Sequence, residues 1–255
     1  MWIDTHCHPF ASSFTGEVDA VFDRAHAAGV GTFLVVGFGT ASNKEALALA
    51  AQREDVWASL GVHPCDCGDW TPQIEAFIRS EVAVNPKVVA LGEMGLDYHH
   101  MRSSKEVQAE VFRAQIRLAK ELNLPCIVHS RDAAEDTLQI LIEEEAPKAI
   151  FHCYSYDADF AKKVWERGYI TSFSGVLTYP SAKGIQEAAR LAPADLIWIE
   201  TDCPYLAPQS IRGQRNEMAR VAEIGEFLAH LRGISPEQLQ VQLRENWRRV
   251  LGIGF

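Results

Sequence analysis

Eight short apolar runs alternate with longer amphipathic stretches along the whole chain. Each run has four to seven residues, many of them β-branched, which is typical of buried parallel strands. We predict strands at 2–6, 32–37, 57–63, 88–93, 125–129, 149–152, 169–173 and 196–200. A chain of 255 residues with this alternation matches an α/β fold of one (β/α)₈ TIM barrel, predicted as a single domain over 1–255. A doubly wound open sheet is the alternative.

The amphipathic stretches predict helices that pack on the sheet. They are 17–28, 42–53, 104–122, 132–145, 157–167, 181–191, 217–231 and 235–251. Ser42 and Glu45 have the spacing of a capping box, so the second helix is expected to begin at Ser42.

The composition limits the partners that the chain is expected to have. Its net charge of −10 disfavours avid, non-specific binding along duplex DNA. There is no apolar run of about 18 residues and no secretory signal, so we predict a cytoplasmic protein with no membrane partner. No feature predicts an obligate protein partner. The six cysteines are expected to be reduced, with Cys65 and Cys67 as ordinary loop residues.

Polar side chains of metal-ligand type stand where the predicted strands end. They are His6, His8, Glu93, His129, His152 and Asp202. The C-terminal ends of barrel strands form one rim, which carries the active site in essentially all such enzymes. These residues are therefore expected to meet at one mouth and to hold metal ions.

The first two histidines are spaced so that both imidazoles can bind one cation. His6 and His8 are two residues apart, so on a strand both side chains point the same way. Cys7 points the other way and is expected to pack inside the barrel. Asp202 is expected to complete the site of this first cation.

A second cation is expected beside the first. Glu93 can bridge two cations with its two oxygens, and His129 and His152 can supply nitrogens to the second. Four imidazoles with two carboxylates suit zinc or manganese, whereas magnesium prefers more oxygen. Any one histidine at a strand end is more often a hydrogen-bonded loop residue, and the prediction depends on the whole set.

The remaining histidines are expected to be ordinary loop or surface residues. They are His26, His99, His100 and His230. His99 and His100 follow a rim position closely enough to touch a substrate.

Several longer motifs run through almost the whole chain. They are Asp4-Thr5-His6-Cys7-His8, Gly61-Val62-His63-Pro64, Gly92-Glu93-Met94-Gly95-Leu96-Asp97-Tyr98, His129-Ser130-Arg131, Phe151-His152-Cys153, Glu200-Thr201-Asp202-Cys203-Pro204-Tyr205-Leu206-Ala207-Pro208 and Arg212-Gly213-Gln214-Arg215-Asn216-Glu217. In these motifs and their order the chain resembles the TatD family of metal-dependent hydrolases, often described as deoxyribonucleases. The resemblance implies a barrel, two divalent metal ions on the six ligands above, and hydrolysis of DNA phosphodiester bonds, including exonucleolytic cleavage.

The chain departs from the family pattern at three places near the expected mouth. Cys65 stands where a further histidine is common, Tyr154-Ser155-Tyr156 replaces Phe-Ser-Gly, and Met218 stands where proline is usual after Asn-Glu. None of these changes removes an expected ligand, but each puts the substrate preference in doubt.

The expected chemistry is attack by a metal-bound hydroxide on the phosphoryl group, with Mg²⁺, Mn²⁺ or Zn²⁺ as the cation. Asp202 is expected to be both ligand and proton acceptor. Glu200, two residues earlier, is expected either to act as a base or outer-shell partner or to be a structural carboxylate. His63 is expected to contact the phosphate or the leaving group.

Three arginines are candidate clamps for the substrate phosphate, because guanidinium grips phosphate through paired hydrogen bonds. They are Arg131, Arg212 and Arg215. For Arg212 and Arg215, an exposed and solvated loop is the competing interpretation.

Two other functions remain open. An amidohydrolase-like enzyme could use the same ligands on a small amide, lactone or phosphoester, because hydroxide attacks carbonyl carbon and phosphorus alike. A non-catalytic, metal-stabilised binding protein is the third interpretation, although structural metal sites tend to be closed and tetrahedral.

Overall fold

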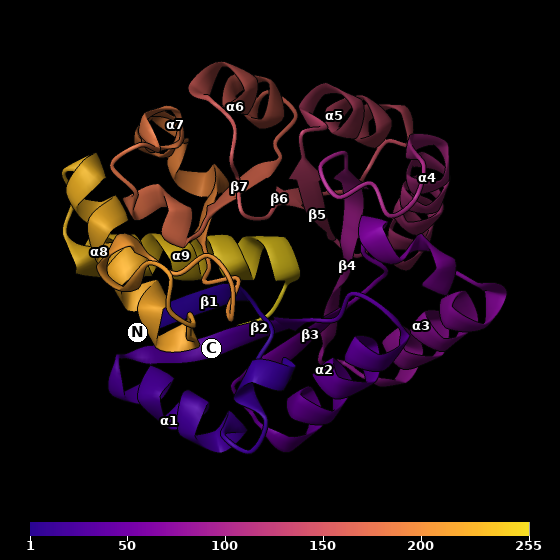
Figure 1. Cartoon of the computed structure of the whole chain (residues 1–255), viewed down its shortest axis with the longest axis horizontal. Coiled ribbons are helices and arrows are strands. Elements are labelled where there is room, and N and C mark those ends of the chain that lie inside the picture. The colour runs from indigo at the N-terminus through magenta and orange to yellow at the C-terminus, as the bar shows by residue number, and fades with distance from the viewer. Residues whose placement is uncertain (255) are drawn as a thin grey trace. The chain divides into compact units, whose positions relative to one another are not determined.

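A computed structural model describes residues 1–254 (Figure 1). Its strands are β1 (Trp2–Cys7), β2 (Val30–Val36), β3 (Val56–Leu60), β4 (Val88–Asp97), β5 (Cys126–Arg131), β6 (Ala149–Phe151), β7 (Ile170–Phe173) and β8 (Ile197–Ile199). They form one sheet in chain order, β1 to β8. After β8 the chain runs beside β1, where the Asp202 amide donates to the His6 carbonyl at 2.9 Å. The fold is a (β/α)₈ barrel, as predicted.

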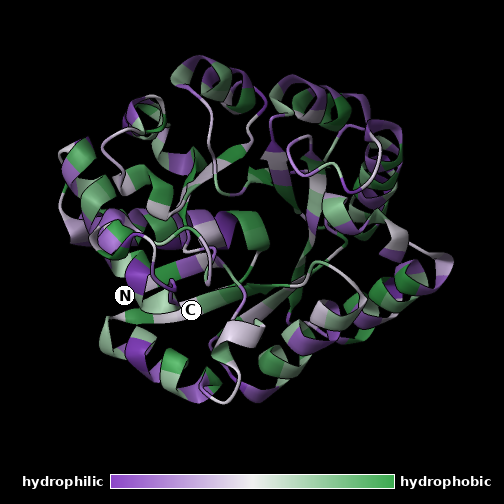
Figure 2. Cartoon of the chain, viewed as in Figure 1, coloured by the Kyte–Doolittle hydropathy of each residue, from purple (hydrophilic) through white to green (hydrophobic). Residues whose placement is uncertain are grey.

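Helices occupy the connections between the strands, and the last two helices follow β8. They are α1 (Val18–Ala27), α2 (Thr40–Gln52), α3 (Pro72–Val84), α4 (Lys105–Leu122), α5 (Ala134–Glu143), α6 (Ala158–Trp165), α7 (Lys183–Leu191), α8 (Val221–Arg232) and α9 (Pro236–Leu251). Figure 2 shows that the ribbons of these helices alternate between hydrophobic and hydrophilic residues, as expected for helices with one buried face. No helix within residues 1–254 is long and apolar enough to cross a membrane.

Two expectations about the helices were wrong. Helix α3 was not predicted, although its N-cap Thr71 accepts a hydrogen bond from the Ile74 amide at 3.3 Å. The second helix begins at Thr40 and not at Ser42. Ser42 lies inside the first turn, where its Oγ accepts from the Phe38 amide at 2.9 Å, so it ties the preceding loop to the helix.

The chain falls into two compact units, and the boundaries lie within β2 and directly after β6. The first unit is 1–34 with the chain from His152 onward, and its core includes the fully buried rings of Trp198 and Trp247, 6.0 Å apart. The second unit is Val35–Phe151, where α4 packs against β4 and buries Phe112. The expectation of one domain stays a prediction.

Candidate metal-binding clusters

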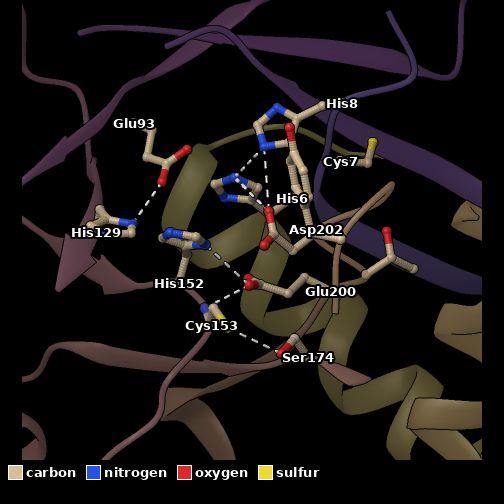
Figure 3. Close-up of polar contacts among 12 residues, drawn as sticks. His6, Cys7, His8, Glu93, His129, His152, Cys153, Ser174, Glu200 and Asp202 are labelled. Carbon is tan, nitrogen blue, oxygen red and sulfur yellow. Dashed lines mark hydrogen bonds and ion pairs between the residues drawn. The ribbon is translucent and has the colours of Figure 1, made fainter. Parts of the chain in front are cut away.

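The first unit carries a cluster of three imidazoles and one carboxylate, which we call the first cluster: His6, His8, His152 and Asp202. The Nε2 atoms of His6 and His8 are 3.2 Å apart, and both lie close to Asp202 Oδ1, at 3.7 and 3.4 Å. The ring of His152 stacks on that of His6 at 4.0 Å between centroids. Figure 3 shows these side chains turned toward one another.

The backbone explains why residues so distant in sequence meet. His6 and His8 flank the end of β1 on the same side, while Cys7 points away and its Sγ donates to the Leu34 carbonyl at 3.4 Å. The pairing of β1 with β8 continues beyond the strands, since the His8 amide donates to the Cys203 carbonyl at 3.0 Å. Asp202 is thereby held beside the two imidazoles. The prediction that Cys7 packs in the interior is confirmed, because it is fully buried.

Glu200 stands behind His152 as its hydrogen-bond partner. Glu200 Oε1 lies 3.3 Å from His152 Nδ1 and accepts from the Cys153 amide at 2.6 Å. Glu200 is fully buried, and its Oε2 has no hydrogen-bond partner within residues 1–254. Of the roles that the sequence left open, this contact favours an outer-shell partner, because ligating histidines usually give their other N–H to a carboxylate.

The charge state of Asp202 follows from its neighbours. Burial raises the pKa of this carboxyl, but the hydrogen bond from His8 and the proximity of His152 and His6 outweigh burial and hold the pKa below its usual value. Asp202 is therefore an anion at neutral pH, as a ligand must be.

The second unit carries another group of donors, the second cluster: His63, Glu93, Asp97 and His129. His129 lies between two carboxylates, with Nδ1 2.9 Å from Glu93 Oε1 and Nε2 3.1 Å from Asp97 Oδ2. His63 Nε2 lies 3.4 Å from the same Glu93 oxygen. Figure 3 shows the contact between His129 and Glu93.

Two glycines allow β4 to hold these carboxylates close to β5. Gly92 and Gly95 have φ of +127° and +144°. A Cβ on Gly95 would lie 1.9 Å from the His129 carbonyl oxygen, and one on Gly92 would lie 2.3 Å from the Ile127 carbonyl oxygen. The glycines on both sides of Glu93 are therefore required by the close approach of the two strands.

The proton of His63 is fixed by its own loop. The Cys65 amide donates to His63 Nδ1 at 3.0 Å, so this nitrogen carries no proton. The proton of the neutral ring is therefore on Nε2, which faces Glu93. His63 is arranged as a hydrogen-bond donor, and its expected contact to the phosphate or the leaving group stays a prediction.

Asp97 is the member of this cluster that was not predicted as a site residue. It is fully buried at the end of β4, four residues after Glu93. Burial raises the pKa of its carboxyl, but hydrogen bonds from His129 and from the His100 backbone and ring outweigh burial and hold the pKa well below its usual value. The expected strand ended at Glu93, whereas β4 continues to Asp97, which hid the carboxylate from a search of strand ends.

The three candidate phosphate clamps differ in their surroundings. Arg131 is exposed at the end of β5. Arg212 is exposed and lies over the ring of Tyr179, 4.3 Å from its centroid. Arg215 donates to Glu17 at 3.0 Å and to Glu217 at 2.8 Å. Arg215 is thus held by ion pairs and is not the fully solvated loop residue of the competing interpretation, and substrate binding by all three arginines stays a prediction.

Both clusters suit divalent cations by their donor types. In the first cluster, Nε2 of His6, Nε2 of His8 and Asp202 Oδ1 form a triangle with edges of 3.2, 3.4 and 3.7 Å. Ligands at zinc bond lengths and tetrahedral angles lie about 3.3 Å apart, so the triangle matches one face of such a site. In the second cluster, donor atoms of His63, Asp97 and His129 lie within 4.8 Å of one another. The residues present therefore fit metal ions.

A (β/α)₈ barrel with imidazole and carboxylate clusters at its strand ends defines a class of protein, the metal-dependent hydrolases of barrel fold. The chain belongs within this class to the family described as TatD related DNase, whose profile matches residues 3–252. The resemblance noted in the sequence is thereby confirmed.

Individual relatives match over nearly their whole length. The chain is 40% identical over 256 residues to the uncharacterized metal-dependent hydrolase YabD of Bacillus subtilis, with 100% of both chains covered. It is 34% identical to the 3'-5' ssDNA/RNA exonuclease TatD of Shigella flexneri, with 96% of each covered. The crystal structure of YjjV, a TatD homolog from Escherichia coli K12, superposes with a TM-score of 0.91 at 28% identity, covering 99% of this chain and 98% of that one.

Proposed function

We propose that this chain is a metal-dependent deoxyribonuclease that hydrolyses phosphodiester bonds near an end of single-stranded DNA. The observation that carries the proposal is the donor triangle of His6, His8 and Asp202, whose edges match a zinc coordination face. The relative in Shigella flexneri that is named a single-stranded DNA and RNA exonuclease supports the substrate class.

The net charge of −10 supports an action at strand ends. A long duplex along the surface of an acidic protein is disfavoured at long range, whereas one terminal phosphodiester group needs local contacts alone. Hydrolysis of a phosphodiester bond is therefore compatible with the negative charge of the chain if the nucleic acid is short or single-stranded.

We assign one divalent cation to each cluster. His6, His8 and Asp202 hold one, with His152 stacked on His6, and His129 holds the other together with Glu93 on its Nδ1 side or Asp97 on its Nε2 side. A divalent cation so placed lowers the pKa of a coordinated water to near neutrality and stabilises negative charge on a phosphoryl group. The bridging role expected of Glu93 stays a prediction.

The chain's own groups then have distinct roles. Asp202 is ionised and accepts the proton of the attacking water, since its pKa is held below the usual value. Glu200 accepts the N–H of His152 Nδ1, which leaves the lone pair of this ring on Nε2 for a cation. His63 donates from Nε2 to a phosphoryl or leaving oxygen, because its Nδ1 accepts from the Cys65 amide.

A turnover screen of the purified chain tests the proposal. The chain is freed of metal with a chelator, reloaded separately with Zn²⁺, Mn²⁺ or Mg²⁺, and given single-stranded DNA labelled at either end, a dinucleotide, and a small amide and lactone. We expect metal-dependent release of nucleotides from single-stranded DNA. Asp202→Asn is the inactive control that excludes a contaminating nuclease.

The two alternatives correspond to different outcomes of the same screen. Turnover of the amide or lactone without cleavage of any phosphodiester would replace the proposal by an amidohydrolase-like activity. Loss of folding on metal removal, with no turnover of any substrate after reloading, would indicate a metal-stabilised binding protein.

A further inference from the structure

A third group of ligand-type side chains lies in the second unit, outside the set expected from the sequence. It consists of Cys65, Asp97 and His100, each of which brings one donor atom within 4.8 Å of the other two. Cys65 lies in the 3₁₀ helix η2 (Pro64–Asp69), and His100 lies three residues after the end of β4. Thiol, carboxylate and imidazole together are the donor set of zinc-class cations and not of magnesium or calcium.

The chain holds His100 directly over Asp97. Asp97 Oδ1 accepts from the backbone amides of His99 and His100, at 2.9 and 2.7 Å, which turns the chain back as it leaves β4. His100 Nδ1 then lies 2.8 Å from Asp97 Oδ2. The backbone hydrogen bonds to Asp97 therefore fix the position of His100 relative to this carboxylate.

The thiol of Cys65 makes no hydrogen bond within residues 1–254, in contrast to the thiols of Cys7 and Cys67. The thiol of Cys7 donates to the Leu34 carbonyl at 3.4 Å, and that of Cys67 donates to the Pro64 carbonyl at 3.1 Å. The thiol of Cys65 is half-buried and makes no hydrogen bond in the part of the chain that the structure describes. The position of Cys65 is nevertheless fixed, because its amide donates to His63 Nδ1 at 3.0 Å.

We infer that Cys65, Asp97 and His100 form a third cation site, which takes zinc or a similar borderline divalent ion. Binding forms a sulfur–metal bond and releases the thiol proton to solvent, so the site gains a thiolate ligand. His100 has a side chain 47% exposed, and Cys65 is partly exposed, which leaves room for water or a substrate oxygen as a further ligand. Asp97 links this site to the second cluster, because its Oδ2 also lies 3.1 Å from His129 Nε2.

Cobalt substitution tests the site without any assay of turnover. The purified, metal-free chain is titrated with Co²⁺, and the near-ultraviolet thiolate-to-cobalt charge-transfer band is recorded together with the number of bound ions per chain. We expect a band in the wild type that is lost in Cys65→Ser, with one bound ion fewer. Cys67→Ser is the matched control, two residues away in the same helix η2, and it should keep both the band and the ion.

Further variants decide between this site and other sources of the band. His100→Ala is expected to weaken Co²⁺ binding at the thiolate at least tenfold. A band that survives Cys65→Ser, or that disappears in Cys153→Ser, would assign the thiolate to another place and overturn the proposal. Absence of the band in the wild type overturns it as well.

A chemical measurement on the wild type covers the case in which Cys65→Ser does not fold. Zn²⁺ should slow the alkylation of Cys65 by iodoacetamide, read from the Cys65 peptide by mass spectrometry and compared with the same protein kept metal-free by a chelator. Equal rates with and without Zn²⁺ would overturn the proposal. Because neither readout involves catalysis, a failed nuclease assay leaves this test unaffected.

Discussion

The two clusters use similar donors in different arrangements. In the first cluster, His6, His8 and Asp202 direct donor atoms at a common point, and their separations match a metal coordination face. In the second cluster, His129 is hydrogen-bonded on both ring nitrogens to carboxylates, at 2.9 and 3.1 Å. The first cluster combines three imidazoles with one carboxylate, whereas the second combines two imidazoles with two carboxylates.

These donor sets have consequences for affinity and for selectivity. Binding in either cluster replaces hydrogen-bonded protons, so it should weaken as the pH falls. The second cluster has two carboxylates beside its histidines, which makes it the better site for manganese or magnesium. The three imidazoles of the first cluster favour zinc.

Asp202→Asn should have the largest effect on function, because it removes the one anion among three imidazoles. We expect turnover of single-stranded DNA to fall by about 10²–10⁴-fold, with the fold intact by circular dichroism. Asp195→Asn, at an exposed position of the same unit, is the control and should retain full activity. Full activity in Asp202→Asn would refute its role.

Gly95→Ala should lower the free energy of unfolding more than a glycine-to-alanine change in a loop of the first unit. The new Cβ would meet the His129 carbonyl oxygen at 1.9 Å, at φ +144°, so we expect the free energy of unfolding to fall by about 3 kcal/mol or more. Gly213→Ala is the matched control, with φ +86° and nothing within 4 Å, and should cost about 1–2 kcal/mol. Equal losses in urea unfolding would contradict the close approach of the strands.

Glu200→Gln and Asp97→Asn should separate the clusters by their metal affinity. Glu200 supports His152 and Asp97 contacts His129, so each change should weaken one cluster about 10–100-fold. Competition with a chromophoric chelator measures both. Glu187→Gln, on the exposed side of α7, should change nothing. An unchanged affinity in Glu200→Gln would show that the buried carboxylate is structural alone.

His63→Gln should reduce turnover about tenfold without loss of bound metal, if His63 donates to the substrate and is not a ligand. The readouts are kcat on single-stranded DNA and ions bound per chain. Loss of one ion per chain would instead make His63 a ligand of the second cluster.

Arg215→Gln should have the smallest effect, less than about 1 kcal/mol in the free energy of unfolding, because its ion pairs are partly exposed. Burial raises the pKa of Glu217, but Arg24 and Arg215 outweigh burial and lower it. The stabilisation is therefore present above the usual glutamate pKa of about 4.3 and is lost as the pH falls below it. Urea unfolding at about pH 7 and about pH 3 should show the difference between wild type and variant shrinking. A large rise in KM for DNA would restore Arg215 as a phosphate clamp.

The alternation of apolar runs was enough to predict the barrel, because a strand of a parallel sheet is buried on both faces and its apolar run marks it directly. Helix α3 was missed although Ile74, Phe77, Ile78 and Val82 have the spacing of one helical face. The N-terminal signal was also present, since Thr71 precedes Pro72.

The ligand types could be read from strand ends, but the network around them could not. Asp97 was missed because the pattern gave no reason to extend β4 beyond Glu93, although Gly95 marks the continued close approach. Which carboxylate supports which imidazole, as Glu200 supports His152, depends on packing across strands that are 48 residues apart in sequence. Sequence spacing alone holds no information on such pairs.

The contact between β1 and the segment after β8 also sets when during synthesis the first cluster can form. A chain that leaves the ribosome N-terminus first exposes His6 and His8 early, but their carboxylate partner Asp202 lies almost two hundred residues further along the chain. The half-made polypeptide thus has imidazoles without their anion. The first cluster therefore cannot form before the segment that follows β8 has been made.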